Sequence, residues 1–334
     1  MLAPLIFFDY LTQSIIDWGI IMERKLKKYG LIFIAVAMIL LALFMFYPVL
    51  YSFYLSLTST KLGKTDFVWF ANYKRILTDP LFWISLKNTF VILLIQVPVM
   101  LFLALILATI LNDKSIKFRG FFRTALFLPA VTSLIAYTIL FKMLFSYTGL
   151  LNTTLMRINL ISEPIEWMSN PITAKAVLII AMIWRWTGYN MVFYLSGMQN
   201  ISEDIYEAAS IDGASKIKSF FMITLPLLKP MILFTTIMST IGTLQLFDEP
   251  MNLSQGGVTA ATIGPSNSLL TLSVYIYNLS FKYVPNFGYG ATVAYVIVIL
   301  IGILTLIQFR VGATDDEKEA RKLKKQNRRE KRRA

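Results

Sequence analysis

Few residues in this sequence could carry chemistry. The chain contains no cysteine and no histidine, which excludes disulfides, Cys/His zinc sites, cysteine nucleophiles and histidine bases. Within or beside long apolar stretches there remain Arg185, Trp186, Tyr189, Asn190, Gln245 and Tyr295. Such groups either contact a ligand in a path between helices or join neighbouring helices through hydrogen bonds. The sequence leaves both interpretations open.

The elements that must position these groups are membrane-spanning helices. Of the 334 residues, 56% are hydrophobic and 15% are charged, whereas average soluble domains carry about 25% charged residues. A bilayer core about 30 Å thick takes roughly 20 apolar helical residues to cross. Candidate spans lie at residues 30–50, 86–111, 123–145, 173–198, 230–247 and 287–309. The sequence therefore predicts an all-α membrane protein with six transmembrane helices.

Basic residues predict the orientation of these spans. The formal net charge is +13, and Lys and Arg precede the first span, follow the second, separate the fourth from the fifth and fill the C-terminal tail. Because Lys and Arg accumulate on the cytoplasmic side, we expect both termini in the cytoplasm. The organisation is then an N-terminal segment at 1–29, a six-span domain at 30–310 and a basic tail at 311–334. This distribution favours membrane orientation over nucleic-acid binding as the reason for the charge.

The first 21 residues indicate that the functional chain starts after Met1. Residues 1–21 lack the basic region and cleavage site of a signal peptide. A basic block follows Met22 directly before the first apolar stretch. We expect the functional chain to start at Met22.

Acidic residues argue against two other classes of membrane protein. All 19 lie outside the predicted apolar cores, whereas carriers driven by protons or sodium usually place Asp or Glu inside the membrane and often show an internal repeat. No nucleophile and base are paired as in a membrane enzyme. The sequence also lacks a Walker-type phosphate loop. If ATP drives this protein, another chain binds the ATP.

The segment 201–229 is too long for a simple connection between spans. Ser202 followed by two acidic residues is typical of a helix start, with a side-chain cap and a favourable dipole interaction. Gly213 predicts a break, because glycine permits turns that other residues resist. A second short helix should then run to Pro226, which is expected to end it. Composition alone fits either a protein contact or an amphipathic helix lying on the membrane.

The same segment resembles a known family. The residues that carry the likeness are Glu207, Ala208, Ala209, Asp212, Gly213, Ala214, Phe221, Ile223, Thr224, Leu225, Pro226, Leu228 and Pro230. Their pattern is similar to the signature of permeases in binding-protein-dependent ABC importers. The resemblance implies that this loop is a cytoplasmic coupling helix docking in a cleft of the ATPase. It assigns ATPase coupling to Glu207, Ala208, Ala209, Asp212, Gly213, Ala214 and Pro226.

Further motifs resemble the carbohydrate branch of that family. They include Phe70, Asn72 and Tyr73, the pair Asp79 and Pro80, Phe127 to Pro129, Gly149 to Asn152, the pair Phe247 and Asp248, and Phe287 to Ala291. The likeness is to the first permease of maltose and glycerol-phosphate systems. It implies the type I ABC importer permease fold in the plasma or inner membrane. The outer loop 254–270 departs from the family, because Gly256 and Gly257 are followed by Val258 and a longer run.

The resemblance also implies an assembly. The partners would be a second homologous permease, two ABC ATPase subunits, an extracytoplasmic solute-binding protein, a sugar and membrane lipid. ATP and Mg would bind the ATPases, with no cofactor on this chain. Because no acid lies at depth and Arg185 is the only deep cation, we expect a neutral di- or oligosaccharide as cargo. A glycerol-phosphate or polyol cargo remains the alternative, and a secondary transporter is the more distant one.

Overall fold

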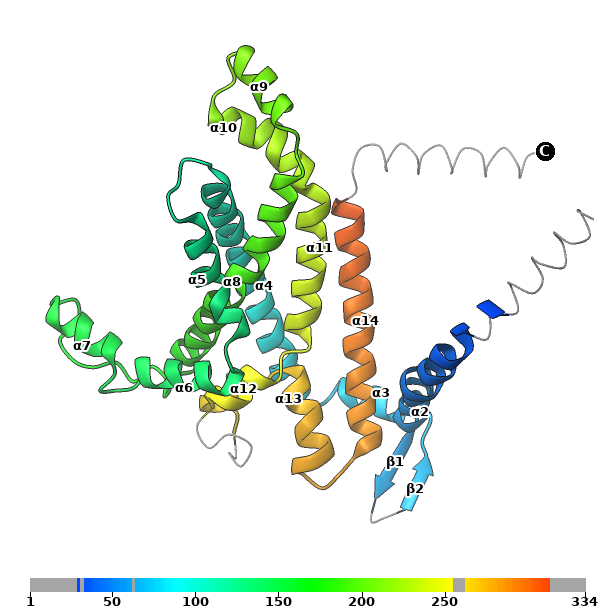
Figure 1. The fold of residues 1–334 in the computed structure, drawn as a ribbon. Coiled ribbons are helices and arrows are strands. Elements are labelled where there is room, and N and C mark those ends of the chain that lie inside the picture. Colours follow the sequence, from blue (N-terminus) through cyan, green and yellow to red (C-terminus); the bar gives the residue numbers. More distant parts are fainter. Residues whose placement is uncertain (1–28, 31–32, 62–63, 255–261, 313–334) are drawn as a thin grey trace, which may run out of the picture.

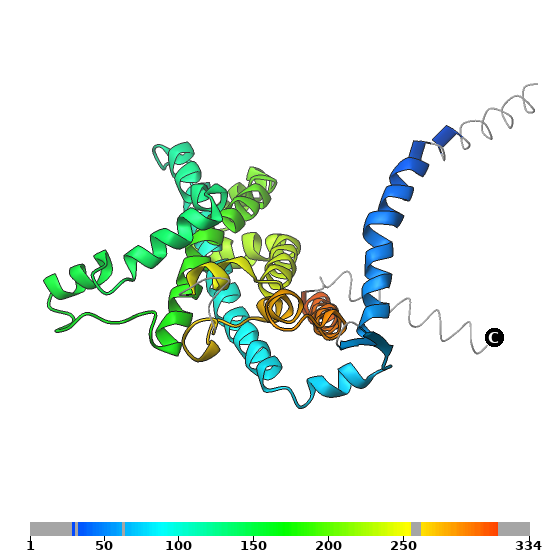
Figure 2. The same ribbon diagram turned by 90° about the horizontal axis from the view of Figure 1, so that it is seen from below.

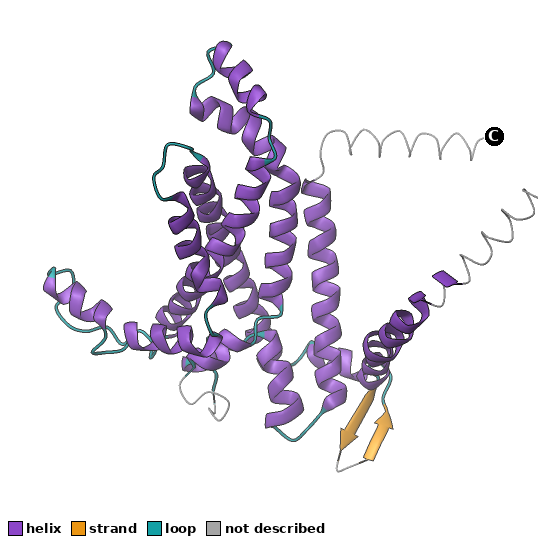
Figure 3. Ribbon diagram, viewed as in Figure 1, coloured by secondary structure: helices purple, strands orange, loops and turns teal. Residues whose placement is uncertain are grey.

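A computed structural model describes residues 29–30, 33–61, 64–254 and 262–312 (Figure 1). The expected start at Met22, the tail 313–334 and the core of the departing outer loop lie outside the described residues. The body is a set of long helices running side by side (Figures 1 and 3). They are α4 (Pro80–Asn112), α8 (Pro171–Gln199), α11 (Leu225–Leu244) and α14 (Phe287–Gly312).

Five helices of the described chain are long and apolar enough to cross a membrane: Phe33–Ser56, Pro80–Asn112, Pro171–Gln199, Lys216–Leu244 and Phe287–Gly312. Local sequence explains where two of them begin. The Asp79 carboxylate accepts the backbone N–H groups of Leu81 and Phe82 at 2.9 and 3.3 Å. Asn170 likewise caps α8 through the N–H of Ile172 at 2.8 Å. A proline follows each cap, where its missing N–H costs nothing.

The single span expected at 123–145 is wrong in shape. The structure breaks it into α5 (Arg119–Val131) and α6 (Leu134–Leu144), which meet at 97°. Pro129 lies near the end of α5, and the backbone of Thr132 is extended. The Thr132 hydroxyl donates to the Pro129 carbonyl at 2.7 Å, so a side chain satisfies part of the interrupted backbone. Within the described ranges there are six candidate spans if this bent pair counts as one.

The all-helical expectation also misses one hairpin. Strands β1 (Thr58–Lys61) and β2 (Lys64–Phe67) pair antiparallel, with Thr58 opposite Phe67. The hairpin is tied to α3 (Ala71–Ile76) because the Asn72 amide donates to the carbonyls of Ser56 and Thr58 at 2.9 and 2.7 Å. The hairpin follows the first span directly, so it lies at that span's end (Figure 1).

The first span stands apart from the body. It includes the π-helical turn η1 (Ala42–Phe46) and α2 (Tyr47–Ser56), and its most apolar part is 0% buried. In the view of Figure 2 this blue helix is separated from the other spans except near its end. There, Phe53 packs edge-on against Tyr295 of α14 at 5.3 Å between ring centroids. Most of this span therefore presents its apolar surface to lipid or to another protein.

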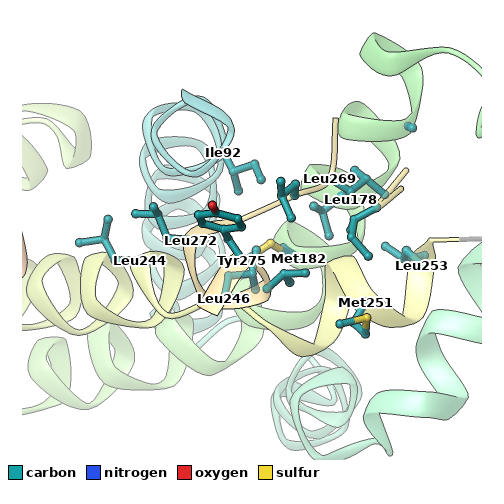
Figure 4. Close-up of a cluster of buried hydrophobic side chains, with 14 of the residues drawn as sticks. Ile92, Leu178, Met182, Leu244, Leu246, Met251, Leu253, Leu269, Leu272 and Tyr275 are labelled. Carbon is teal, nitrogen blue, oxygen red and sulfur yellow. The ribbon is translucent and has the colours of Figure 1, made fainter. Parts of the chain in front are cut away.

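The apolar core lies where α4 and α8 meet the chain between α11 and α14. Short helices α12 (Asp248–Leu253) and α13 (Leu272–Tyr277), the 3₁₀ turn η4 (Pro265–Asn267) and the π-helical turn η5 (Asn278–Lys282) fill this region. Figure 4 shows Ile92, Leu178, Met182, Leu244 and Leu272 converging there. Packing of this kind fixes α8 against α11 and α12. It therefore positions the polar groups between them.

Candidate functional site

The 201–229 segment projects beyond the body at one end (Figure 1). It contains α9 (Glu203–Ile211), α10 (Lys216–Ser219) and the π-helical turn η2 (Phe220–Thr224). The break expected at Gly213 is present: its φ is +75°, and its N–H bonds the Ser210 carbonyl at 3.0 Å. Ala214 closes the turn by donating to the Ala209 carbonyl at 2.9 Å.

Most of the residues assigned to coupling share an exposed surface. Glu207, Ala208, Asp212 and Gly213 are exposed, while Ala209 and Ala214 are half-buried. Helix α9 contains no buried residue. A helix with small side chains and no face packed on its own chain can be approached closely by another protein.

Three local expectations for this segment and for the start of the fifth span are wrong. Pro226 does not end a helix, because η2 leads directly into α11 and Pro226 lies in its first turn. Pro226 thus lies inside the continuous helix Lys216–Leu244, directly after the π-helical turn η2. Pro230 lies inside α11 rather than at the start of the fifth span. Ser202 is the N-cap of α9, but its hydroxyl donates to Asp204 at 3.2 Å instead of capping a backbone N–H.

Ion pairs join this segment to the connection between α4 and α5. Lys216 Nζ lies 3.3 Å from Asp113 Oδ2, and Lys114 pairs with Glu203. Hydrogen bonds from the Ser115 backbone and hydroxyl, together with Lys216, lower the pKa of Asp113 to about 2. Two neighbouring residues of that connection, Asp113 and Lys114, thus contact the first residues of α10 and α9. Both pairs are exposed, so they guide the contact more than they stabilise it.

A cavity of about 410 Å³ lies between α4, α8, α11 and α12. Aromatic rings, amides and hydroxyls dominate its polar lining. The lining residues are Gln96, Met100, Leu134, Met182, Trp186, Tyr189, Asn190, Phe193, Phe234, Thr235, Met238, Ser239, Gly242, Thr243, Gln245, Leu246, Phe247, Asp248 and Glu249. Clefts of this size with a few placed polar groups in an apolar wall are typical of small-molecule sites.

Four of the six expected path residues line this cavity: Trp186, Tyr189, Asn190 and Gln245. The Asn190 amide is oriented by donating to the Trp186 carbonyl at 3.0 Å. The ring of Tyr189 packs against Trp186 at 5.7 Å and against Phe193 at 5.1 Å between centroids. Tyr189 and Gln245 are both exposed. Their polar groups can therefore meet a solute.

The other two expected path residues, Arg185 and Tyr295, lie outside the cavity lining. Arg185 is 7% exposed and does not line the cavity. Its guanidinium carbon lies 4.5 Å from the ring centroid of Tyr137 on α6. The Tyr295 hydroxyl donates to the Val49 carbonyl at 2.6 Å, which joins α14 to α2. For both, the structure favours the helix-joining interpretation.

Three polar groups that line the cavity were not assigned to the path from the sequence: Gln96, Asp248 and Glu249. Gln96 is 2% exposed and accepts a hydrogen bond from Thr243 at 2.9 Å. Glu249 is 5% exposed and lies beside Asp248 in the lining. Burial raises the pKa of the Glu249 carboxyl, while Tyr137 and Arg185 oppose that shift. The signal available in the sequence was the pair of acids directly after an apolar stretch.

The fold and these two sites define a polytopic membrane protein built as a transport subunit. Residues 18–312 match the family described as "Binding-protein-dependent transport system inner membrane component". The chain belongs to this family, as its resemblance had indicated.

Curated relatives are permeases of sugar transport systems. The chain is 51% identical over 291 residues to the "Lactose transport system permease protein LacF" of Rhizobium radiobacter, covering 86% of this chain and 96% of that one. It is 35% identical over 298 residues to the "Arabinooligosaccharides transport system permease protein AraP" of Bacillus subtilis (strain 168), covering 87% and 90%. The chain is therefore similar to ABC permease subunits, which are membrane-embedded transport proteins.

Solved structures confirm the fold class. A chain of a bacterial ABC transporter "involved in the import of the acidic polysaccharide alginate" superposes with a TM-score of 0.74 at 19% identity, covering 87% of this chain and 98% of that chain. The expected type I ABC importer permease fold is therefore correct. At this identity the likeness shows the fold alone.

Proposed function

We propose that this chain forms half of the translocation path of an ATP-driven importer for oligosaccharides. The observation that carries the proposal is the cavity between α4, α8 and α11, where Trp186 and Tyr189 lie near the amides of Asn190 and Gln245. Sugars bind through hydroxyl hydrogen bonds and through packing of their C–H faces on aromatic rings. Relatives named for lactose and arabino-oligosaccharide transport support the same cargo class.

The assembly we propose contains a second homologous permease, two ABC ATPase subunits and an extracytoplasmic solute-binding protein. The unburied first span supports a protein partner within the membrane. The exposed turn around Gly213 supports an ATPase contact. A structure of the alginate transporter "in complex with alginate pentasaccharide-bound periplasmic protein" has the same fold. ATP and Mg bind the ATPases in this proposal, and this chain carries no cofactor and no hydrolytic step.

We place α9 and both termini in the cytoplasm. Lys114, Lys117, Lys216 and Lys218 gather in the connections at the α9 end of the body, and the positive-inside rule assigns that end to the cytoplasm. The β1–β2 hairpin then lies outside, where a binding protein would deliver its cargo.

Contacts in the chain support a route from α9 to the cavity. Tyr206 of α9 shares a hydrogen bond of 2.8 Å with Thr224 of η2, which continues into the cavity-lining helix α11. Lys216 pairs with Asp113 at the end of α4. Helix α4 also contributes Gln96 to the cavity lining. Closure of the ATPases on ATP would displace α9. That displacement would move α4 and α11 relative to α8 and change access to the cargo.

Uptake by the complete importer tests this function. Cells carrying the permease pair, the ATPases and the binding protein should accumulate radiolabelled lactose or an arabino-oligosaccharide in an ATP-dependent manner. Glycerol phosphate, sorbitol and amino acids serve as competitors. Uptake of a polyol or of glycerol phosphate with no uptake of oligosaccharide would establish the alternative cargo. Uptake that persists without the ATPases and collapses with the proton gradient would establish a secondary transporter.

A further inference from the structure

The charged side chains of the described residues that line the cavity are all acidic. Asp248 and Glu249 line it, and among the described residues no Lys or Arg does. Sequence analysis had placed no acid at depth and had treated Arg185 as the only deep cation. In the folded chain α12 packs against α6 and α8 and brings its two acids to the cavity.

Arg185 packs against aromatic rings behind these acids and does not line the cavity. Its guanidinium carbon lies 4.5 Å from the Tyr137 ring centroid and 5.4 Å from that of Trp186. Arg185 and Tyr137 both interact electrostatically with Glu249. Burial raises the pKa of the Glu249 carboxyl, and the positive charge of Arg185 offsets only part of that effect, from outside the cavity. Arg185 does not present a cation to a solute inside.

We propose that Asp248 and Glu249 make this path selective for uncharged sugars and that they accept hydrogen bonds from sugar hydroxyls. The inference rests on the proposed function and names its cargo more narrowly. It also sets this chain apart from an importer of the same fold whose cargo is an acidic polysaccharide.

The physical reason is that a solute hydroxyl and a solute anion interact differently with these two carboxylates. A hydroxyl donates to a carboxylate and forms a charge-assisted hydrogen bond, which is roughly twice as strong as a neutral one. A carboxylate or phosphate on the solute has no proton to donate and meets like charge where water is partly excluded. Selectivity therefore comes from a repulsive element as well as from attraction. The aromatic wall at Trp186 and Tyr189 treats both solutes alike.

Two open-chain relatives of lactose isolate the charge. Lactitol and lactobionate both carry an intact galactosyl ring on an opened second unit, and they differ by an alcohol against a carboxylate. The purified complex of permeases and ATPases, without the binding protein, would be assayed for displacement of radiolabelled lactose. Omitting the binding protein removes its own selection. The variants are Asp248→Asn, Glu249→Gln and the double replacement. Glu163→Gln with Glu166→Gln changes two exposed acids outside the cavity and serves as the matched control.

In the wild-type complex we expect lactobionate to displace lactose at least about tenfold less effectively than lactitol does, a difference of about 1.4 kcal/mol. In the double variant the ratio should fall to within about threefold, and the control should keep the wild-type ratio. Equal displacement in the wild type, or an unchanged ratio in a double variant that retains its ATPase activity and still binds lactose, would overturn the inference. Absence of saturable lactose binding to the wild type would instead contradict the proposed cargo class.

Discussion

The Tyr289 hydroxyl donates a hydrogen bond of 2.5 Å to the carboxylate of Asp79, which lies 210 positions earlier in the chain. Tyr275 donates to the same oxygen at 2.5 Å, while the other oxygen caps α4. Arg75 lies 4.2 Å from the centroid of the Tyr289 ring. One carboxylate thus joins the starts of α4 and α14 to α13.

Asp79→Asn should lower the melting temperature of the purified complex. The amide preserves the shape but keeps one acceptor oxygen, which cannot serve both the two hydroxyls and the N–H groups at the start of α4, and an unsatisfied buried donor costs about 1–3 kcal/mol. Burial alone would raise the pKa of Asp79, but bonds from Tyr275, Tyr289 and the backbone outweigh it and leave the pKa below its ordinary value of 3.8. The carboxylate's contribution is complete above pH 3.8 and is lost as the pH falls through the lower folded value.

The advantage of wild type over Asp79→Asn in melting temperature should therefore be constant near neutral pH and shrink under acid. Asp66→Asn, at an exposed position of β2, is the control and should change neither quantity. An Asp79→Asn melting temperature equal to that of the wild type at pH 7 would refute this role.

Gly213→Val should reduce uptake per ATP hydrolysed without preventing membrane insertion. A Cβ at Gly213 meets no atom within 4 Å, but its φ of +75° is unfavourable for a β-branched residue. The left-handed conformation costs roughly 1–2 kcal/mol for most residues and less for Asn. Gly213→Asn should therefore remain coupled. Gly302→Val, at an open helical position of α14, is a second control. Equal coupling in the Val and Asn variants would show that the turn's conformation is not needed.

Glu207→Lys should uncouple ATP hydrolysis from uptake while leaving the complex assembled. Glu207 is exposed on α9, so the change reverses charge at the proposed ATPase contact without disturbing a core. Glu166→Lys reverses an exposed charge outside that contact and should have no such effect. The assay is sugar transported per ATP hydrolysed in proteoliposomes. Normal stoichiometry in the Glu207 variant would remove α9 from the coupling route.

Lys114→Glu should weaken coupling modestly, and Lys114→Glu with Glu203→Lys should restore it. The first change breaks the ion pair with Glu203, and the second rebuilds it with reversed charges. Since both side chains are exposed, the loss should be under about threefold and should diminish at high salt. A double variant no better coupled than the single one would show that the ion pair is incidental.

Tyr189→Ala and Gln245→Ala should lower sugar uptake severalfold while basal ATPase activity persists. A path must bind its cargo weakly in order to release it, so single changes should have modest effects. Tyr295→Phe removes a hydroxyl bonded to Val49 instead of one at the cavity, and it should leave the apparent affinity for sugar unchanged. A larger loss of affinity in Tyr295→Phe than in Tyr189→Phe would place the path on the α14 side.

Sequence periodicity predicted the long helices because each carries enough apolar residues to cross a bilayer. It could not predict the break after α5, since a proline inside a span is often tolerated and the extended backbone at Thr132 depends on what α6 packs against. It also placed Pro226 at a helix end. The π-helical turn η2 continues into α11 across Pro226, and only the fold shows this continuation.

The cavity was predictable in part. Trp186, Tyr189 and Asn190 lie close together in sequence on a single helix, so one face of α8 brought them to one place. Glu249 was missed because its burial arises from α12 folding back on α6 and α8, a long-range contact with no local signature. Tyr295 was assigned by residue type alone, and a tyrosine on a span serves equally well to join two helices.

The bend between α5 and α6 also affects the lipid around the protein. Helix α5 has 13 residues, which at about 1.5 Å per residue gives roughly 20 Å of height. The hydrocarbon layer is about 30 Å thick, and α6 adds little height to this span because it turns away from α5 at 97°. This wall of the permease is therefore about 10 Å too short for the hydrocarbon layer. Either the bilayer thins beside α5, or a neighbouring subunit covers the difference. A mismatch confined to one side gives the permease a preferred edge for meeting its partner.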